Sequence, residues 1–451
     1  MNKKHEIDMS RGRLLPKLLA FSLPLMLTNM LQITFNTMDL IVVGRFAGEN
    51  SLAAVGSNGA LITLVVCVLG GMGTGASVLV SRFFGAKDEI NIRETVQTTV
   101  IVAVAGGVLV GILGAILANP LLRLMGTPDE VLPLATLYLR IFFGGMPVIV
   151  LYNFAGAILR AVGDTKRPLY YLALAGVLNV GMNLLFVIVF HLNVAGVAIA
   201  TVLSQCVSCT LTVRCLVKSD AMYKLDIRHM RFSKKHFLQL LRIGLPAGIQ
   251  GSLFSLSNMT IQSAINAFGA VSMAGNSAAV SIESYCFTAQ DSVSQAAQTA
   301  VSQNMGASQF DRTKKTVFQC TILEIAISAL LCYTAMIFRY PLLGIFTPDK
   351  AAIAAGATRL FINMLIYFMN GLMNMMNGVL RGHGYSILPT VISLLGVCVF
   401  RIVWVTTVFS RNPSLTVLYI SYPISWAATS AALYICYFAL RKKAFAKNML
   451  A

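Results

Sequence analysis

The chain has 451 residues, of which 57% are hydrophobic and only 12% are charged. A soluble protein of this length carries roughly twice that charged fraction, so the composition excludes a soluble enzyme or binding domain and indicates an integral membrane protein. The formal net charge of +18 would suit a nucleic-acid partner, but the placement of the basic residues indicates membrane topology instead.

Apolar stretches long enough to cross a membrane follow one another along the chain. A helix needs about 20 apolar residues to span the hydrocarbon core. We predict twelve spans, near residues 18–43, 52–81, 96–118, 134–159, 168–190, 194–217, 238–267, 273–302, 317–338, 354–380, 386–409 and 415–439. The first is too long for a signal peptide and shows no small-residue cleavage site, so we expect it to be retained.

The first span carries a stripe of polar residues. Asn29, Gln32, Asn36 and Asp39 are spaced 3, 4 and 3 residues apart, which places them on one face of a helix. A carboxylate inside a membrane helix is costly, so we expect Asp39 to face a cavity or polar partners. Pro24 in the same helix lacks a backbone donor and predicts a kink.

The basic residues are concentrated in alternate loops. Most of the 35 lysines and arginines lie in residues 1–17, 82–93, 160–167, 214–242, 312–315, 381 and 441–447. This is the positive-inside bias, and it predicts that both termini lie in the cytoplasm. No basic patch with interleaved aromatic residues is present, so we expect no nucleic-acid partner.

The chain is internally doubled. Residues recur at a nearly constant offset of 220 to 222 positions, as in the pairs Pro24 and Pro246, Asn36 and Asn258, Arg160 and Arg381, and Pro168 and Pro389. Six spans per half make both copies enter the membrane from the same side, so we predict a parallel repeat. The expected domains are residues 1–217, a cytoplasmic linker at 218–236, and residues 237–451.

Two further polar stripes lie in the second half. The eighth span carries Thr288, Asp291, Gln295, Gln298 and Ser302, with Glu283 a little over two turns earlier, and the tenth carries Asn363, Asn370, Asn374 and Asn377 among methionines. A single asparagine can serve as a hydrogen bond between helices. Three stripes on different helices favour a wet cavity, in which methionines supply an adaptable surface.

Other motifs favour packing over chemistry. Cys206 and Cys209 match CxxC but lie in mid-span without a second pair, and the Gly-rich run 70–75 follows no strand. Small residues that let membrane helices approach closely explain both motifs. We therefore expect no metal site and no cofactor.

These features together resemble the multidrug and toxic compound extrusion (MATE) transporters, of the bacterial NorM/DinF-like type. The resemblance covers nearly the whole chain and rests on twelve spans in two halves, on Pro24, Gln32 and Asp39, and on the loop RAVGDTKRP (160–168) with its echo RGHGYSILP (381–389). It implies an all-α integral membrane protein, with twelve transmembrane helices in two parallel-repeat six-helix bundles that form a V-shaped central cleft.

The family exports organic cations and other amphipathic compounds by antiport against Na⁺ or H⁺. The resemblance thus implies a secondary active antiporter of the cytoplasmic membrane that is not an enzyme, and we expect a monomer. Its cation site carries over to Asp39, Asn179, Asn183 and Thr201. The expected substrate cavity comprises Gln32, Asn36, Tyr138, Asn153, Asn258, Gln262, Glu283, Asp291, Asn370 and Asn374.

The chain departs from the family pattern in two places. One branch carries acids in the seventh and tenth spans, where this chain has Asn258, Gln262 and Asn370 or Asn374; Glu283 and Asp291 are the candidate substitutes. Some proton-coupled members have an acid in the fifth span, where this chain has Asn183. One carboxylate among neutral oxygens suits Na⁺, whereas a desolvated Asp39 can carry H⁺, so both coupling ions stay open.

Two rival classes are less well supported. A flippase of lipid-linked oligosaccharides from the same superfamily would need several cavity-facing bases, whereas Arg401 is the clearest base in mid-span and Arg140 lies nearer an end. A membrane-embedded enzyme would need an acid dyad, a metal cluster or a nucleophile with its base at membrane depth, and the sequence shows none of these.

Overall fold

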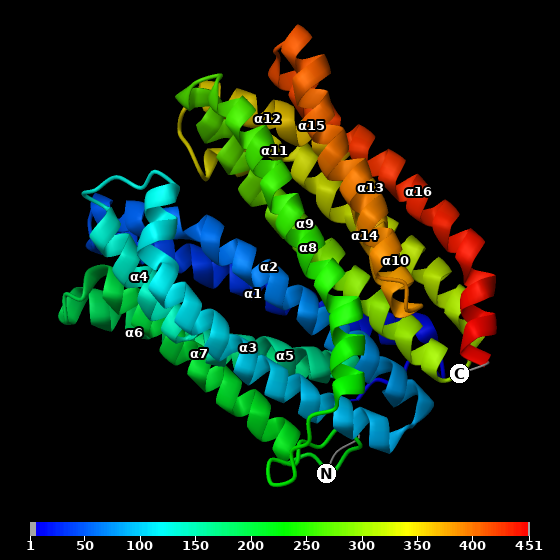
Figure 1. Cartoon of the computed structure of the whole chain (residues 1–451). Coiled ribbons are helices and arrows are strands. Elements are labelled where there is room, and N and C mark those ends of the chain that lie inside the picture. Colours follow the sequence, from blue (N-terminus) through cyan, green and yellow to red (C-terminus); the bar gives the residue numbers. More distant parts are fainter. Residues whose placement is uncertain (1–5, 450–451) are drawn as a thin grey trace. The chain divides into compact units, whose positions relative to one another are not determined.

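The structure is a computed structural model that describes residues 6–449, without the side chains of Glu49 and of residues 443–449. Lys3 and Lys4, which belong to the basic amino-terminal segment used to predict the topology, lie outside the described residues. Within the described range the chain consists of helices joined by short connections, apart from the longer connection of residues 218–233 (Figure 1).

The first half of the chain is made of helices, and those that follow the first helix pack on one another. They are α1 (Leu14–Phe46), α2 (Glu49–Ala86), α3 (Glu89–Leu124), α4 (Leu132–Gly144), α5 (Met146–Ala161), α6 (Lys166–Leu184), the π-helical turn η1 (Leu185–Val189) and α7 (Asn193–Val217). In Figure 1, α3, α5 and α7 run alongside one another, and residue contacts join α3 to α5 and α5 to α7.

The second half repeats this order of elements. It comprises α8 (Lys234–Asn266), α9 (Ala270–Gly306), α10 (Phe310–Ile337), α11 (Arg339–Gly344), α12 (Lys350–Leu365), α13 (Phe368–Gly382), α14 (Ile387–Ser393), η2 (Leu394–Val399), α15 (Phe400–Trp404), η3 (Val405–Phe409) and α16 (Leu415–Met449). Its centre is α9, which packs against α10, α12 and α13.

The internal doubling is visible in the backbone geometry. α4 and α5 form one bent pair at an angle of 50°, and α12 and α13 form its counterpart at 52°. Gly163 has a φ of 89°, and Gly384, 221 residues later, has a φ of 91°. These φ values lie in a region that side chains disfavour, which accounts for glycine at the same turn of both repeats.

Helix length and composition agree with a multi-pass membrane protein. Among the described residues, eight helices are long and apolar enough to cross a membrane, or ten when each bent pair is counted as one span. α8 and α9 have 33 and 37 residues but are more polar. With these two helices, the elements match the twelve predicted spans.

Contacts divide the chain into two compact units. The first comprises residues 1–8 and 27–244, and the second comprises residues 9–26 and 245–451. In this division the start of α1 belongs to the second unit and the start of α8 to the first. Each helix changes unit within two residues of a proline, Pro24 in α1 and Pro246 in α8.

The outward faces of the helices are apolar. On α3, for example, Leu109, Ile112 and Ile116 are 59%, 56% and 65% exposed and recur at helical spacing. Apolar residues in this position suit contact with lipid tails.

Inside the first unit, Gly75 of α2 faces the start of α8, where an added Cβ would lie 2.6 Å from the carbonyl oxygen of Leu240. Gly75 therefore allows the two helices to pack closely, whereas Gly70 of the same run has no neighbouring atom within 4 Å of an added Cβ.

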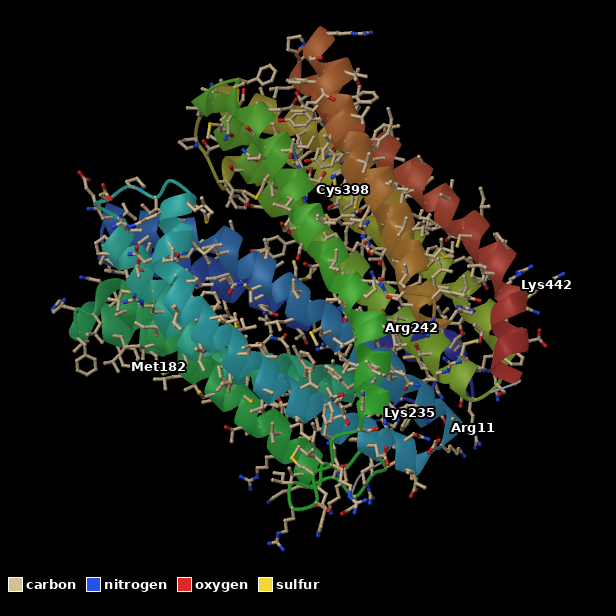
Figure 2. All side chains as sticks on the ribbon, in the orientation of Figure 1. Arg11, Met182, Lys235, Arg242, Cys398 and Lys442 are labelled. Carbon is tan, nitrogen blue, oxygen red and sulfur yellow. The ribbon has the colours of Figure 1, made fainter. Side chains whose placement is uncertain are left out.

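Basic side chains mark one end of each unit. In the first unit, Lys235 and Arg242 lie toward the end that holds the connection from α7 to α8 (Figure 2). In the second unit, Arg11 and Lys442 lie toward the end at which α16 finishes (Figure 2). At this end the guanidinium of Arg312 donates to the carbonyl oxygens of Met9, Arg11 and Gly12, which anchors the amino-terminal segment.

The start of α8 is held to α3 by a buried histidine. The imidazole of His236 lies 2.8 Å from the Ser233 hydroxyl and 3.1 Å from Asn91 Oδ1, and its Nδ1 is 3.4 Å from Glu94. It also packs edge-on against the Phe83 ring. Burial lowers the pKa of His236 below its ordinary value of 6.5, although Glu94 opposes this effect.

We predict that this junction weakens in acid. The folded state disfavours the imidazolium. The stability that neutral His236 gives to the junction of α3 and α8 is therefore present above pH 6.5, and it is lost as the pH falls from there toward the lowered pKa of His236. Hydrogen exchange of residues 234–244 should therefore accelerate on acidification, beyond the change expected of the exchange chemistry alone. His236→Gln should remove this additional acceleration of exchange. An equal acceleration in that variant would show that His236 does not cause the pH effect.

Candidate functional site

The polar stripe of α1 lines a small pocket in the first unit. Gln32, Asn36 and Asp39 of α1 face residues of α6 and α7 across it. The remaining lining residues are Phe35, Leu172, Ala175, Gly176, Asn179, Thr201, Ser204 and Gln205. The structure therefore brings together residues that the sequence places on the first, fifth and sixth spans. Asn29 is not among the residues that line this pocket.

Hydrogen bonds join Asp39 to both neighbouring helices. Asn183 Nδ2 of α6 donates to Asp39 Oδ1, and the Thr201 hydroxyl of α7 lies 3.4 Å from Oδ2. Asn183 also donates to Asn179 Oδ1 at 3.3 Å. All four predicted coupling residues thus belong to one hydrogen-bonded group. Neither Asn183 nor Thr201 brings a positive charge to the carboxyl group.

One oxygen of this group is left without a partner. Asn183 Oδ1 is buried and accepts no hydrogen bond, although a buried carbonyl oxygen ordinarily does. The pocket lined by Asp39, Asn179 and Thr201 of the same group has a volume of about 40 Å³, enough to hold a small ion or a water molecule. A carboxylate with nearby neutral oxygens can satisfy a hard cation, or the carboxyl group can bind a proton.

Glycine at position 176 sets the spacing of α1 and α6. A Cβ at Gly176 would lie 1.8 Å from the Phe35 ring, so only glycine accommodates this aromatic side chain. Phe35 lies one helical turn before Asp39, and Gly176 lies one turn before Asn179. The close packing of Phe35 on Gly176 therefore positions the carboxylate against the amides.

Tyr138 and Asn153 were both expected in the substrate cavity. Tyr138 is buried in the apolar core of the first unit and stacks on Phe142 with a centroid distance of 6.3 Å. Asn153 uses its amide to donate to the carbonyl oxygen of Ile149, in its own helix, at 2.8 Å. Neither residue is part of the hydrogen-bonded group around Asp39.

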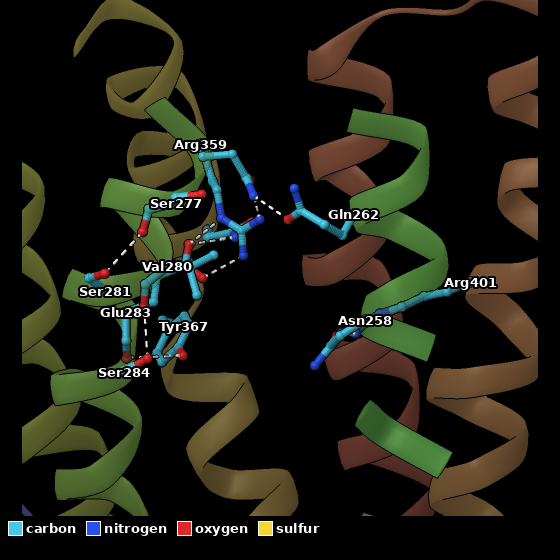
Figure 3. Close-up of polar contacts among 12 residues, drawn as sticks. Asn258, Gln262, Ser277, Val280, Ser281, Glu283, Ser284, Arg359, Tyr367 and Arg401 are labelled. Carbon is cyan, nitrogen blue, oxygen red and sulfur yellow. Dashed lines mark hydrogen bonds and ion pairs between the residues drawn. The ribbon is translucent and has the colours of Figure 1, made fainter. Parts of the chain in front are cut away.

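The second unit is organised around a buried ion pair that the sequence did not reveal. Arg359 of α12 donates to both carboxylate oxygens of Glu283, at 3.0 and 2.7 Å (Figure 3). Asn363 donates to the same carboxylate at 2.9 Å. Glu283 and Arg359 are 7% and 4% exposed, so the pair is shielded from solvent. The negative charge of Glu283 is therefore balanced within the unit.

Further predicted residues extend this network. Arg359 donates to Asn276 Oδ1 at 2.6 Å, and Asn276 donates to Gln262 Oε1 at 2.7 Å. Asn258 lies nearby on α8 and accepts from Arg401 at 3.1 Å (Figure 3). Arg401 also lies 4.1 Å above the Tyr422 ring. Asn258 and Gln262 thus contact arginine networks directly or through one neighbour.

The remaining predicted residues of the second unit are Asp291, Asn370 and Asn374. Asp291 is half-buried and accepts from Gln295 at 2.7 Å. Asn374 is also half-buried and donates to Asn370 at 3.3 Å. Asp291 is therefore more accessible than the buried Glu283.

Sequence reasoning missed Arg359 and Glu324. Arg359 lies in the tenth span one helical turn before Asn363, and Glu324 is a single acid in the ninth span. A charged residue inside an apolar span is a signal by itself, because its burial requires a partner or neutralisation. The stripe patterns drew attention to amides instead.

We predict that the ion pair in the second unit matters for stability. Removing one partner leaves an uncompensated buried charge, which costs roughly 3–5 kcal/mol. Arg359→Met and Glu283→Met should therefore each lower the thermal midpoint of the purified protein strongly, whereas the double variant should lose less than their sum. As a control, Lys314→Ala removes the exposed pair with Asp311 and should leave the midpoint unchanged. Additive effects of the two Met variants would contradict the coupling.

Known proteins resemble this chain over most of its length. The MatE family model matches residues 24–185 and again residues 246–406, in agreement with the doubling. The probable multidrug resistance protein YoeA of Bacillus subtilis is 29% identical, with 94% of this chain and 93% of that protein covered. The probable multidrug resistance protein NorM of Thermotoga maritima is 25% identical, with 86% and 84% covered.

Solved structures share the fold. An outward-facing multidrug resistance MATE family transporter of the MOP superfamily superposes with a TM-score of 0.91 at 20% identity, with 100% of each chain covered. A MOP superfamily transporter from Pyrococcus furiosus gives the same score at 21% identity, with 98% and 99% covered. Because its two repeats match the family model over more than half of its residues, the chain belongs to the MatE family of membrane transporters.

Proposed function

We propose that the protein is a secondary active antiporter that exports organic cations and other amphipathic compounds in exchange for Na⁺ or H⁺. The observation that carries the proposal is the group formed by Asp39, Asn183 and Thr201 beside a small polar pocket. Relatives from Bacillus subtilis and Thermotoga maritima that are named probable multidrug resistance proteins support the substrate class.

The donor set around Asp39 favours Na⁺ as the coupling ion. A hard monovalent cation binds oxygen ligands, and here a carboxylate lies beside amide and hydroxyl oxygens, one of which lacks a hydrogen-bond partner. The alternative ion is H⁺, since the same carboxyl group can be neutralised by protonation. In either case, ion binding removes an uncompensated charge at membrane depth.

Coupling requires that ion and drug stabilise different states of one protein. A ligand with equal affinity for both states shifts nothing, however tightly it binds. Asp39 and Pro24 lie 15 residues apart in α1. We propose that neutralisation of Asp39 lets α1 repack with a different bend near Pro24, and that this change is the switch.

The half-buried polar residues of the second unit are the proposed substrate surface. Asp291 offers the negative charge that would attract an organic cation, while Asn374 supplies an amide that donates to the buried Asn370. Glu283 contributes to the architecture rather than to cation attraction, because Arg359 balances its charge. Gln262 and Asn258 belong to the neighbouring hydrogen-bond networks of Arg359 and Arg401.

The flippase alternative is not favoured. A pyrophosphate head group would need several uncommitted bases. Arg359 is engaged by Glu283, and Arg401 contacts Asn258, Ser425 and the Tyr422 ring.

We propose that the protein lies in a bacterial cytoplasmic membrane as a monomer with both termini in the cytoplasm, in keeping with the concentration of basic residues in alternate loops.

We predict that Asp39→Asn keeps the fold and substrate binding but abolishes ion-driven export. The amide is nearly isosteric with the carboxyl group, but it can neither balance a cation nor take up a proton. Fluorescent-cation transport into inverted vesicles should be measured with a Na⁺ gradient and a pH gradient imposed separately. The gradient that drives the wild type identifies the ion.

A matched control is Asp129→Asn, which removes an acid from the same unit at a lining position of a different pocket. It should transport as the wild type does. An Asp39→Asn protein that transports at the wild-type rate under the driving gradient would contradict the role of Asp39.

A further inference from the structure

A second buried acid lies in the second unit, and the proposed function does not use it. Glu324, near the middle of α10, is 0% exposed. The Ser328 hydroxyl lies 3.2 Å from its Oε1, and Oε2 has no hydrogen-bond partner. A carboxylate usually needs several hydrogen bonds or a cation when it is buried. Glu324 has neither in this arrangement.

The neighbouring helix provides a niche for this carboxyl group. A Cβ at Gly371 of α13 would lie 1.9 Å from Glu324 Oε1 and 2.7 Å from its Cδ. The carboxyl group therefore occupies the space that any other residue at position 371 would fill. This close packing holds the side chain inside the unit instead of allowing it to extend toward solvent.

The surrounding charges do not stabilise an ionised Glu324. The acid nearest to it in charge is Asp291 of α9, and two carboxylates do not stabilise one another. Other titratable neighbours are Cys320 and Cys332 of α10 and Tyr434 of α16. The arginines of the adjoining helices interact with other groups: Arg359 of α12 pairs with Glu283, and Arg381 of α13 donates to Gln250 and interacts with the charge of Asp291.

A chain of polar side chains leads away from the acid. Gln290 Nε2 donates to the Ser328 hydroxyl at 2.8 Å, and Gln290 Oε1 lies 3.5 Å from Asn370 Nδ2. Asn374 then donates to Asn370 at 3.3 Å and is itself half-buried. Amides do not relay protons, but they can hydrogen-bond water molecules that enter as the helices fluctuate.

We propose that Glu324 is a proton-binding site of the second unit, which is protonated in this state and exchanges its proton with water along the path through Gln290, Asn370 and Asn374. Protonation removes the buried charge, and the acid then needs to satisfy only a neutral hydroxyl group. Release transfers one proton from the carboxyl group to water and leaves a carboxylate. The site is independent of which ion binds at Asp39, so it goes beyond the proposed antiport.

Infrared spectroscopy of the purified full-length protein in lipid tests this assignment. A protonated carboxyl group gives a C=O stretching band that ionised carboxylates lack. At neutral pH the wild type should show this band, and Glu324→Gln should lose it. The spectrum of Asp39→Asn shows how much of the band comes from the carboxyl group of Asp39. An undiminished band in Glu324→Gln, or no such band in the wild type, would overturn the proposal.

Exchange into D₂O tests whether the site is accessible. The Glu324 band should shift in the wild type, and Asn374→Leu should slow the shift without reducing its amplitude. A band that never shifts would indicate a sealed structural group and would also overturn the proposal.

If Glu324→Gln does not fold, Ser328→Ala should move the band to higher frequency by removing the hydroxyl that contacts Oε1. An unmoved band would then count against Glu324. These spectra need no transport, so their failure leaves the antiport proposal intact.

Discussion

The cost of placing charge at membrane depth governs the interior of this protein. Each buried charged group meets that cost differently. Glu283 is paired with Arg359, Arg401 lies over an aromatic ring with neutral hydrogen-bond partners, and Asp39 contacts amide and hydroxyl groups without a cation. A carboxylate that is compensated by an arginine is structural. We propose that one without such compensation binds an ion, and this difference separates Glu283 from Asp39.

The two repeats share a backbone but not their charged residues. The 50° and 52° bends and the paired glycines at 163 and 384 show how closely the backbones agree. At an offset of 222 residues, however, the counterpart of Asp39 is Ile261, and at 221 the counterpart of Glu324 is Ala103. Duplication therefore supplied the architecture, and substitution at a few buried positions gave each unit its own chemistry.

The sequence predicts the helices and the doubling well, because long apolar runs and a constant offset are properties of one chain read in order. It also predicts that Asp39 faces polar partners, since helical spacing places Gln32 and Asn36 on the same face. It does not predict the partner of Glu283, because Arg359 is 76 residues away and only packing brings the two together. Tyr138 and Asn153 were expected in the substrate cavity, and the sequence did not indicate that their side chains would contact Phe142 and Ile149. Helical periodicity gives the face of a residue and not its neighbour.

The central claim is that Asp39 binds the coupling ion, and equilibrium binding of Na⁺ to the purified protein tests it most directly. Calorimetric titration with Na⁺ at a series of pH values should show binding that weakens as protons compete for the same carboxyl group. Binding should vanish in Asp39→Asn and persist in Asp291→Asn. If protons are the coupling ion, the proton uptake measured on acidification should decrease by one group in Asp39→Asn. Wild-type Na⁺ binding and wild-type proton uptake in Asp39→Asn would together contradict the account.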